Sequence, residues 1–270
     1  MKKRVLSAVL CLTMVIALAG QATAVESPSI RLDGETLPME TAPVVINRTT
    51  YVCYWSVVRA MYPDATAAWE NGQAVVRAEG LTLTIQLGAK YLVANGRYLY
   101  FPDGVQVRDG NILVPVRTLA HALGADVTWD SGSGAVELRS GTGPILSGDQ
   151  YYNADNLYWL SHIIYAESGN QPLDGKIAVG NVVLNRMNSP MFPNTVYGVV
   201  FQRNQFTPVA HGSIYLEPNE ESVAAAKLCM DGANTAGSSL YFVNPRTAPN
   251  SWASRNRPYV ATIGAHAFFG

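Results

Sequence analysis

The sequence contains few charged side chains: only 14% of its 270 residues are Asp, Glu, Lys or Arg, and its formal net charge is −1. Proteins that bind nucleic acid or anionic membrane surfaces usually carry a basic surface, and this balance indicates neither partner. Lysine is scarce, whereas Gly, Tyr and Asn are plentiful. This composition is typical of a β-rich, extracellular protein that faces carbohydrate. The length is sufficient for two modest domains.

Cysteine is also rare. Cys11 lies in the N-terminal apolar segment, which leaves Cys53 and Cys229, far apart in the sequence. They either form one disulfide or remain two buried thiols, and the second interpretation, small residues in a core, is the simpler one. One pair is not a disulfide framework, and there is no CxxC or metal-type spacing. We therefore expect no metal and no cofactor.

Long apolar runs are absent apart from Val5–Ala19, which is shorter than the ~20 residues that a membrane-spanning helix needs. The run follows the basic segment Lys2-Lys3-Arg4 and precedes the small-residue site Ala22-Thr23-Ala24. This order predicts a signal peptide over residues 1–24, cleavage near Ala24 and a secreted mature chain. The alternative is an uncleaved membrane anchor.

Residues 32–139 are expected to form a β-rich (α+β) domain with a diverged internal duplication. Each copy is a hairpin, a short helix and a second hairpin. These segments are 44–52, 56–61 and 68–76 in the first copy, and 105–114, 116–123 and 128–136 in the second. Trp69 and Trp129 occupy matching places. Between the copies, Leu81–Leu87 alternates as a strand, and a hairpin turning at Ala94–Arg97 follows.

Residues 140–151 contain many small residues and predict a linker. The second domain is expected over residues 152–270. We predict a buried helix over Gly175–Met187, capped by Asp174, because its sequence is apolar on nearly all sides. Asn181 and Asn185 share one face of this helix, where they either line a cleft or satisfy backbone groups.

Five further helical or strand segments are predicted. A short helix begins at Thr195, and a longer one carries acidic residues in its first turn. The remaining segments alternate as strands. The expected ranges are 195–201 and 218–231 for the helices, and 239–243, 259–263 and 266–269 for the strands.

Glu167 is the residue that most clearly indicates chemistry. Leu157, Leu160, Ile163 and Ile164 recur at helical spacing, and Glu167 falls on the same apolar stripe at the end of that helix. Burial and the negative end of the helix dipole both disfavour a charged carboxylate and raise its pKa. A protonated carboxylic acid is the proton donor that glycosidic bond cleavage requires. The alternative is a partly exposed glutamate at a fraying helix end, hydrogen-bonded to the next loop.

Nearly the whole C-terminal half resembles the SleB/CwlJ family of cell-wall hydrolases, the spore-cortex-lytic enzymes and their relatives. The resemblance depends on ordered motifs: Tyr165-Ala166-Glu167, Gly175-Lys176-Ile177-Ala178-Val179-Gly180, Val182-Val183-Leu184-Asn185-Arg186, Phe192-Pro193-Asn194-Thr195-Val196, Gln205-Phe206-Thr207, Leu240-Tyr241-Phe242-Val243-Asn244-Pro245, Arg257-Pro258 and Ile263-Gly264-Ala265-His266. In the N-terminal half, Ile112–Ala125 with Val127–Asp130 resembles the copper amine oxidase N-terminal-like domain of bacterial surface proteins. That resemblance implies an accessory module on the cell wall, not copper, since His121 has no partner ligand nearby.

The family resemblance implies a mainly helical, lysozyme-like domain with a small antiparallel sheet. It implies that the protein cleaves peptidoglycan between N-acetylmuramic acid and N-acetylglucosamine as a lytic transglycosylase, in the cell wall or the spore cortex. Glu167 matches the catalytic acid. The family often has a second acid in Gly-Glu-Pro, whereas this chain has Asn170-Gln171-Pro172. The expected substrate-binding residues are Tyr165, Asn181, Gln205, Thr207, Tyr241, Asn244 and His266.

Three other functions are compatible with the sequence. A hydrolytic muramidase would cut the same bond with water, and a non-catalytic wall-binding protein would use the same surface without chemistry. A metal-dependent amidase is disfavoured because His162 and Glu167 are five residues apart, unlike the His-Glu-x-x-His pattern.

Overall fold

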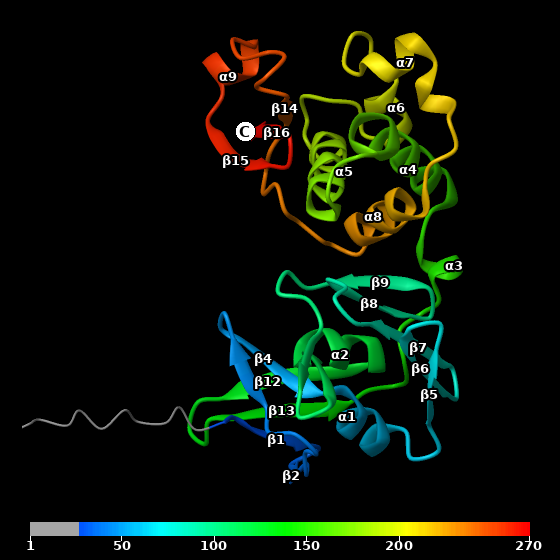
Figure 1. Ribbon diagram of the computed structural model, residues 1–270, viewed down its shortest axis with the longest axis vertical. Coiled ribbons are helices and arrows are strands. Elements are labelled where there is room, and N and C mark those ends of the chain that lie inside the picture. The colour runs from blue at the N-terminus through cyan, green and yellow to red at the C-terminus, as the bar shows by residue number, and fades with distance from the viewer. Residues whose placement is uncertain (1–26) are drawn as a thin grey trace, which may run out of the picture.

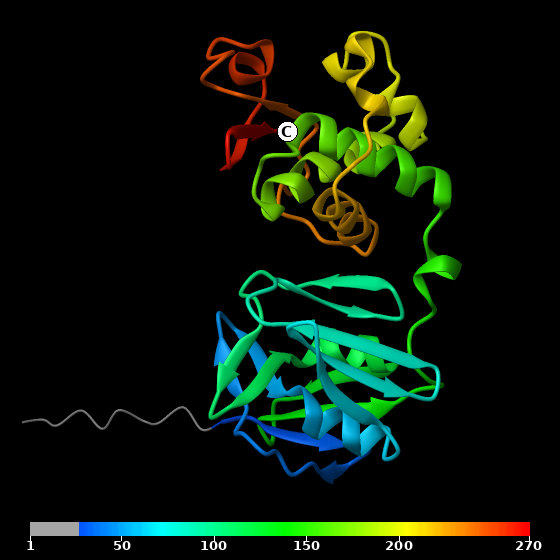
Figure 2. The ribbon, with the colours of Figure 1, turned by 45° about the vertical axis from the view of Figure 1, so that its right-hand side comes forward.

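The structure is a computed structural model that describes residues 27–270 (Figure 1). The signal peptide predicted over residues 1–24 lies outside the described residues. Within residues 27–270, no helix combines the length and the apolar composition that a bilayer crossing demands. The described chain has a β-rich N-terminal part and a helical C-terminal part with a small sheet, as the sequence predicts (Figures 1 and 2).

The N-terminal module consists of three sheets and two helices around one apolar core. One sheet has the order β5-β6-β7-β8-β9, the second β12-β13-β1-β2 and the third β10-β11-β4-β3. The strands are β1 (Ser29–Leu32), β2 (Glu35–Thr36), β3 (Val44–Ile46), β4 (Thr49–Cys53), β5 (Thr66–Glu70), β6 (Gln73–Ala78), β7 (Leu81–Gln86), β8 (Tyr91–Ala94), β9 (Arg97–Tyr100), β10 (Gln106–Arg108), β11 (Asn111–Pro115), β12 (Ala125–Asp130) and β13 (Ala135–Ser140); the helices are α1 (Tyr54–Met61) and α2 (Val116–Leu123).

The order of elements from β3 to β6, hairpin, helix and hairpin, recurs from β10 to β13. The chain turns tightly at Asn71-Gly72 and at Asn95-Gly96, where both residues have positive φ. Such turns match the right-handed twist of antiparallel strands, and Asn and Gly adopt positive φ at little cost. The predicted hairpin at Ala94–Arg97 is present as β8 and β9.

The segment that the sequence predicts as a linker is packed against the N-terminal module. A Cβ atom on Gly124, the left-handed residue that ends α2, would lie 1.6 Å from the carbonyl oxygen of Gly143. The amide side chain of Asn95 donates to the carbonyl of Ile145 at 3.0 Å. The small residues of the linker therefore let its backbone lie directly against the backbone of the N-terminal module.

The C-terminal domain is built on three helices that cross one another, α4, α5 and α8. This domain has an apolar core of its own, whose buried residues are distinct from those of the core of the N-terminal module. The elements are α3 (Gly148–Tyr151), α4 (Ala154–Ser168), α5 (Leu173–Met187), α6 (Val196–Val200), α7 (Thr207–His211), η1 (Ser213–Tyr215), α8 (Glu220–Met230), α9 (Trp252–Asn256), β14 (Tyr241–Val243), β15 (Tyr259–Ile263) and β16 (His266–Phe269). The three strands form one antiparallel sheet in the order β14-β16-β15.

One predicted cap is wrong. The helix α5 begins after Pro172, which has no side-chain capping bond, and Asp174 lies inside the first turn. Its carboxylate instead accepts from Lys90 Nζ at 2.6 Å and from Tyr100 Oη at 3.0 Å, both in the N-terminal module. An acidic side chain is favourable at a helix N-terminus even without a capping bond.

The two cysteines are free, buried thiols in different cores, Cys53 at the end of β4 and Cys229 on α8. The Cys229 thiol donates to the carbonyl of Ile177 at 3.3 Å and lies close to the backbone of α5. A Cβ atom on Gly180 would lie only 2.6 Å from Cys229 Sγ and 2.9 Å from Ile164 Cδ1. Gly180 therefore lets α4, α5 and α8 approach one another at this crossing.

Replacing Gly180 with alanine is expected to lower the free energy of unfolding by about 1–3 kcal/mol, because the new methyl group overpacks this crossing. The higher helix propensity of alanine returns only about 1 kcal/mol. Adding Cys229→Ala to Gly180→Ala removes the sulfur atom that the new methyl group would meet, and should recover most of the lost free energy of unfolding. Urea unfolding of the two single variants and the double variant measures this coupling. Equal losses in Gly180→Ala and the double variant would show that the sulfur is not the obstacle.

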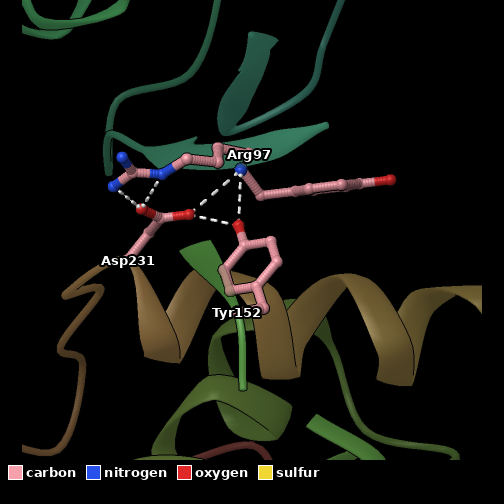
Figure 3. Close-up of polar contacts among 4 residues, drawn as sticks. Arg97, Tyr152 and Asp231 are labelled. Atoms are coloured by element: carbon pink, nitrogen blue, oxygen red, sulfur yellow. Dashed lines mark hydrogen bonds and ion pairs between the residues drawn. The ribbon is translucent and has the colours of Figure 1, made fainter. Parts of the chain in front are cut away.

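The β8–β9 hairpin lies between the rest of the N-terminal module and α8 (Figure 1). Arg97 Nε donates to Asp231 Oδ1 at 2.9 Å, and Tyr152 Oη donates to Asp231 Oδ2 (Figure 3). The Asp231 side chain is 0% exposed and the Arg97 side chain 8%. Arg97 also covers the ring of Tyr151, with 3.4 Å between its Cζ and the ring centroid. The two parts are therefore joined by a buried ionic contact as well as by the chain.

Candidate active site

Glu167 lies on the last turn of α4, whose apolar face forms part of the C-terminal core. Leu160, Ile163 and Ile164 are fully buried, as their helical spacing predicts. The Glu167 side chain is half-buried and lines a solvent-open cavity of about 510 Å³. The residues that share this cavity, named here the Glu167 groove, are Tyr165, Ala166, Gly169, Asn170, Ser213, Leu216 and Asn219.

Burial raises the pKa of the Glu167 carboxyl to about 7. No arginine, lysine or histidine among residues 27–270 forms an ion pair with it. Glu167 is also the only acid among the residues that line its groove in the described part of the chain. A carboxyl group with this pKa is largely protonated below neutrality and can release and regain a proton near pH 7.

The wall of the groove opposite α4 is held by a buried histidine. The ring of His162, one turn before Glu167, makes a hydrogen bond through Nδ1 to the carbonyl of Ile214 at 2.8 Å. This contact joins α4 to η1, and η1 carries Ser213 at its first residue and precedes Leu216. His162 therefore positions one side of the groove.

The loop after Glu167 is held by a buried lysine. Lys176, 1% exposed, donates to the carbonyl of Gln171 at 2.6 Å and pairs with Glu221. The side chain of Gln171 accepts from the backbone N–H of Ala265 at 2.8 Å and does not line the groove. Gln171 therefore fixes the loop after Glu167 to the β15–β16 turn.

The structure brings only Tyr165, of the seven expected substrate-binding residues, into the lining of the Glu167 groove. Asn181 is only 5% exposed and does not line the groove. Its amide donates to the carbonyl of Ala233 at 2.7 Å and accepts from the N–H of Thr235 at 2.9 Å. It satisfies backbone groups, which was the alternative for this helix face.

Gln205 and Thr207 are exposed, and neither lines the groove. Thr207 is the first residue of α7, and Gln205 lies two residues before it. Asn244 accepts from the N–H of Arg246 at 3.0 Å and so turns the chain after β14. Tyr241 is half-buried, and the guanidinium of Arg257 lies over its ring, with its Cζ 5.1 Å from the ring centroid. These positions stay candidates for a more extended binding surface.

His266 is 8% exposed at the start of β16 and packs edge-on against the ring of Phe242. Its Nδ1 has no hydrogen-bond partner within residues 27–270, and burial lowers the pKa of the imidazole. This buried ring belongs to the packing of the small sheet. It does not line the Glu167 groove.

Sequence reasoning missed Ser213, Leu216 and Asn219. They lie in and after η1, and no periodic pattern marks them. Asn219 is also the N-cap of α8, where its side chain accepts from the N–H of Ser222 at 2.9 Å. An N-cap asparagine before Glu220-Glu221 is a recognisable signal for a helix start, but not for a groove. Among the described residues, no group of three or more His, Cys, Asp and Glu side chains could hold a metal ion.

Comparison with known proteins finds a similar family for part of each half of the chain. Residues 170–269 match the Cell Wall Hydrolase family, and residues 26–138 match the Copper amine oxidase N-terminal domain. The first match begins three residues after Glu167. A spore cortex-lytic enzyme of Oceanobacillus iheyensis is 36% identical over 60% of this chain and 59% of its own length. One from Bacillus cereus is 41% identical over 43% of this chain and 45% of its own length.

The chain thus spans about half the length of the curated relatives it matches. Among solved structures, the catalytic domain of the germination-specific lytic transglycosylase SleB from Bacillus anthracis is 39% identical. The match covers 47% of this chain and 100% of that domain, with a TM-score of 0.42.

Proposed function

We propose that this chain, in which a cell wall hydrolase domain follows a copper amine oxidase N-terminal domain, cleaves peptidoglycan glycan strands as a lytic transglycosylase. The bond cut is that between N-acetylmuramic acid and N-acetylglucosamine. One observation carries the proposal: Glu167 combines a pKa of about 7 with a place in an open groove that no second acid lines among the described residues. The similarity to spore cortex-lytic enzymes supports action on peptidoglycan.

The mechanism needs one carboxyl group. Protonated Glu167 donates its proton to the bridging oxygen as the glycosidic bond breaks, and the muramic acid ring gains oxocarbenium character. The resulting carboxylate then takes the proton from the C6 hydroxyl of the same sugar, while that oxygen attacks the anomeric carbon. A 1,6-anhydro ring forms, no water is consumed, and Glu167 ends the cycle protonated. A pKa near 7 suits both halves of this cycle, because neither protonation state is strongly disfavoured.

A two-carboxylate hydrolysis is the second candidate, since many glycosidases use a pair of acids. The contacts of Gln171 argue against it. Its side-chain oxygen is engaged by Ala265 N–H at 2.8 Å, outside the groove lining, so even an acid at this position would face the β15–β16 turn.

Mass analysis of muropeptides released from purified walls by the wild-type chain tests the proposal. We expect products with 1,6-anhydromuramic acid ends, each lighter by one water than the corresponding hydrolysis product. Borohydride treatment provides the control, because it reduces the free ends left by hydrolysis and leaves anhydro ends unchanged. If only reducible ends are released, the chain is a hydrolase and not a transglycosylase. If no muropeptides are released, the chain is a non-catalytic wall-binding protein.

The proposal extends to the rest of the chain. The chain is exported after cleavage near Ala24 and acts in the cell wall or the spore cortex. Residues 152–270 form its catalytic domain, which has a lysozyme-like architecture. Residues 32–139 form an internally duplicated accessory module that contacts the wall. The recurring order of hairpin, helix and hairpin supports the duplication, and the buried contact between Arg97 and Asp231 supports joint action of the two parts.

A further inference from the structure

The N-terminal module has an exposed groove lined by aromatic side chains. A cavity of about 320 Å³ is lined by Tyr54 and Trp55 from the first turn of α1 and by Trp69 from β5, and we name it the aromatic groove. Trp69 is 57% exposed although its strand is regular. The neighbouring Val107 is also 57% exposed. Grouped exposed apolar side chains of this kind mark an interaction site on a soluble module.

Trp129 offers a comparison within the same module. It lies on the edge strand β12 as Trp69 lies on the edge strand β5, and it is almost equally exposed, at 53%. Its cavity is lined by Asp33, Asp130 and Glu137, with no second aromatic residue. An exposed tryptophan at this strand position therefore does not by itself make an aromatic groove, and the groove depends on Tyr54 and Trp55.

The polar groups at the aromatic groove are acceptors without net charge. Glu40 pairs with Arg59 at 3.1 Å, which balances its charge. The side-chain nitrogen of Asn111 donates to Thr41 Oγ1 at 2.8 Å, and within residues 27–270 its Oδ1 has no partner and can accept. A complementary ligand is uncharged along this groove, rich in O–H and N–H donors, and has flat apolar faces for the rings. N-acetylated pyranose sugars have these properties.

The aromatic groove also borders the junction of the two parts. Leu87 lines both this groove and a second cavity of about 420 Å³ at the junction of the two parts, which Leu173 and Glu221 line from the C-terminal domain. Leu173 lies three residues after Asn170, and Glu221 two residues after Asn219, and both asparagines line the Glu167 groove. The aromatic groove thus shares Leu87 with a cavity that reaches the C-terminal domain, and that cavity is lined by segments that continue into the lining of the Glu167 groove.

We propose that the aromatic groove is a remote subsite for the glycan strand that the Glu167 groove cuts. The strand crosses the junction past Leu87, and its sugar rings stack on Trp69 and Trp55. This inference depends on the proposed function for the identity of the polymer. It assigns to the N-terminal module a role in strand binding that is continuous with the site of cleavage, beyond attachment to the wall.

Co-sedimentation with purified, insoluble peptidoglycan tests this subsite. The full chain carries Glu167→Gln as a background so that the walls stay intact, and Trp69→Ala and Trp55→Ala are compared with Trp129→Ala. We expect the first two substitutions to weaken binding about tenfold, as truncation of an aromatic anchor does, and Trp129→Ala to bind like the parent. Since Trp69 and Trp129 are equally exposed, thermal unfolding should show the same stability for both variants.

The second measurement uses chains that keep Glu167. Trp69→Ala should raise KM several-fold on long glycan strands released from walls and leave cleavage of short muropeptide oligomers unchanged, because a short oligomer cannot reach β5. Equal binding by the Trp69→Ala and Trp129→Ala variants, or a loss of the same size on short and long substrates, overturns the subsite. The proposed function fails separately: if the wild-type chain cuts no walls but sediments in a Trp69-dependent way, the subsite stands and the cleavage does not.

Discussion

Replacing Glu167 with glutamine is expected to reduce cleavage of peptidoglycan by at least about a thousandfold. Glutamine has nearly the same size and hydrogen-bonding reach, so the half-buried position on α4 should accept it without rearrangement. Its amide cannot deliver a proton to the bridging oxygen. Within the described residues, no other acid lines the groove to replace it. The loss should appear in kcat, with binding to walls unchanged.

The measurement is the decrease in turbidity of a wall suspension, followed by quantification of anhydro ends. Glu217→Gln is the matched control, because Glu217 is exposed directly after the groove residue Leu216 and does not itself line the groove. That variant should clear walls at the wild-type rate. A Glu167→Gln chain that still clears walls would remove Glu167 from the mechanism.

The wild-type pH profile checks the same role independently. Burial raises the pKa of Glu167 to about 7, and the group must be protonated when the cycle begins. The kcat/KM value should therefore be constant below pH 7 and fall about tenfold per pH unit well above it. An exposed carboxyl of ordinary pKa would instead place that fall near pH 4 to 5. A rate independent of pH between 7 and 9 would contradict the acid role.

Local patterns in the sequence were sufficient to place Glu167 and most helices. The spacing of Leu160, Ile163 and Ile164 fixes which face of α4 is buried, because periodicity within one helix requires no knowledge of other elements. Glu167 shares that stripe and emerges half-buried at its end. Its catalytic role stays a prediction, whereas its burial and raised pKa agree with the local reading.

Patterns within one helix were insufficient where the answer depends on a distant segment. Helix α5 is apolar on nearly all sides, so its sequence could not say whether Asn181 faces a cleft or the loop at Ala233. Ser213 and Leu216 lie at the groove on either side of Ile214, whose carbonyl bonds to His162 across 52 residues. Side-chain-to-backbone contacts over such distances have no periodic signal in the sequence.

The junction between the two parts was the least predictable feature. Small residues at 140–151 indicate a flexible connection, because Gly and Ser usually mark linkers. The same residues permit close approach, as the contact of Gly124 with Gly143 shows. Asp231 follows α8 and Arg97 begins β9, and nothing in either local sequence indicates that they meet.

Replacing Asp231 with alanine is expected to separate the two parts of the chain. The substitution leaves the Arg97 guanidinium, 8% exposed, without its carboxylate, and removes the acceptor for Tyr152 Oη (Figure 3). Loss of one partner of a buried ion pair costs about 3–5 kcal/mol, because the remaining charge stays desolvated. The cost falls on the contact between β9 and α8, since each part has a core of its own.

Scanning calorimetry should then resolve two transitions in Asp231→Ala where the wild type shows one, and limited proteolysis should cut within residues 140–151. Lys90→Ala is the matched control, because its pair with Asp174 is partly exposed and is worth about 0–1 kcal/mol. Replacing both members, with Arg97→Met and Asp231→Leu, should restore coupling, since an apolar pair leaves no buried charge. Single-transition unfolding in Asp231→Ala would mean that packing of the β8–β9 tyrosines joins the two parts without the ion pair.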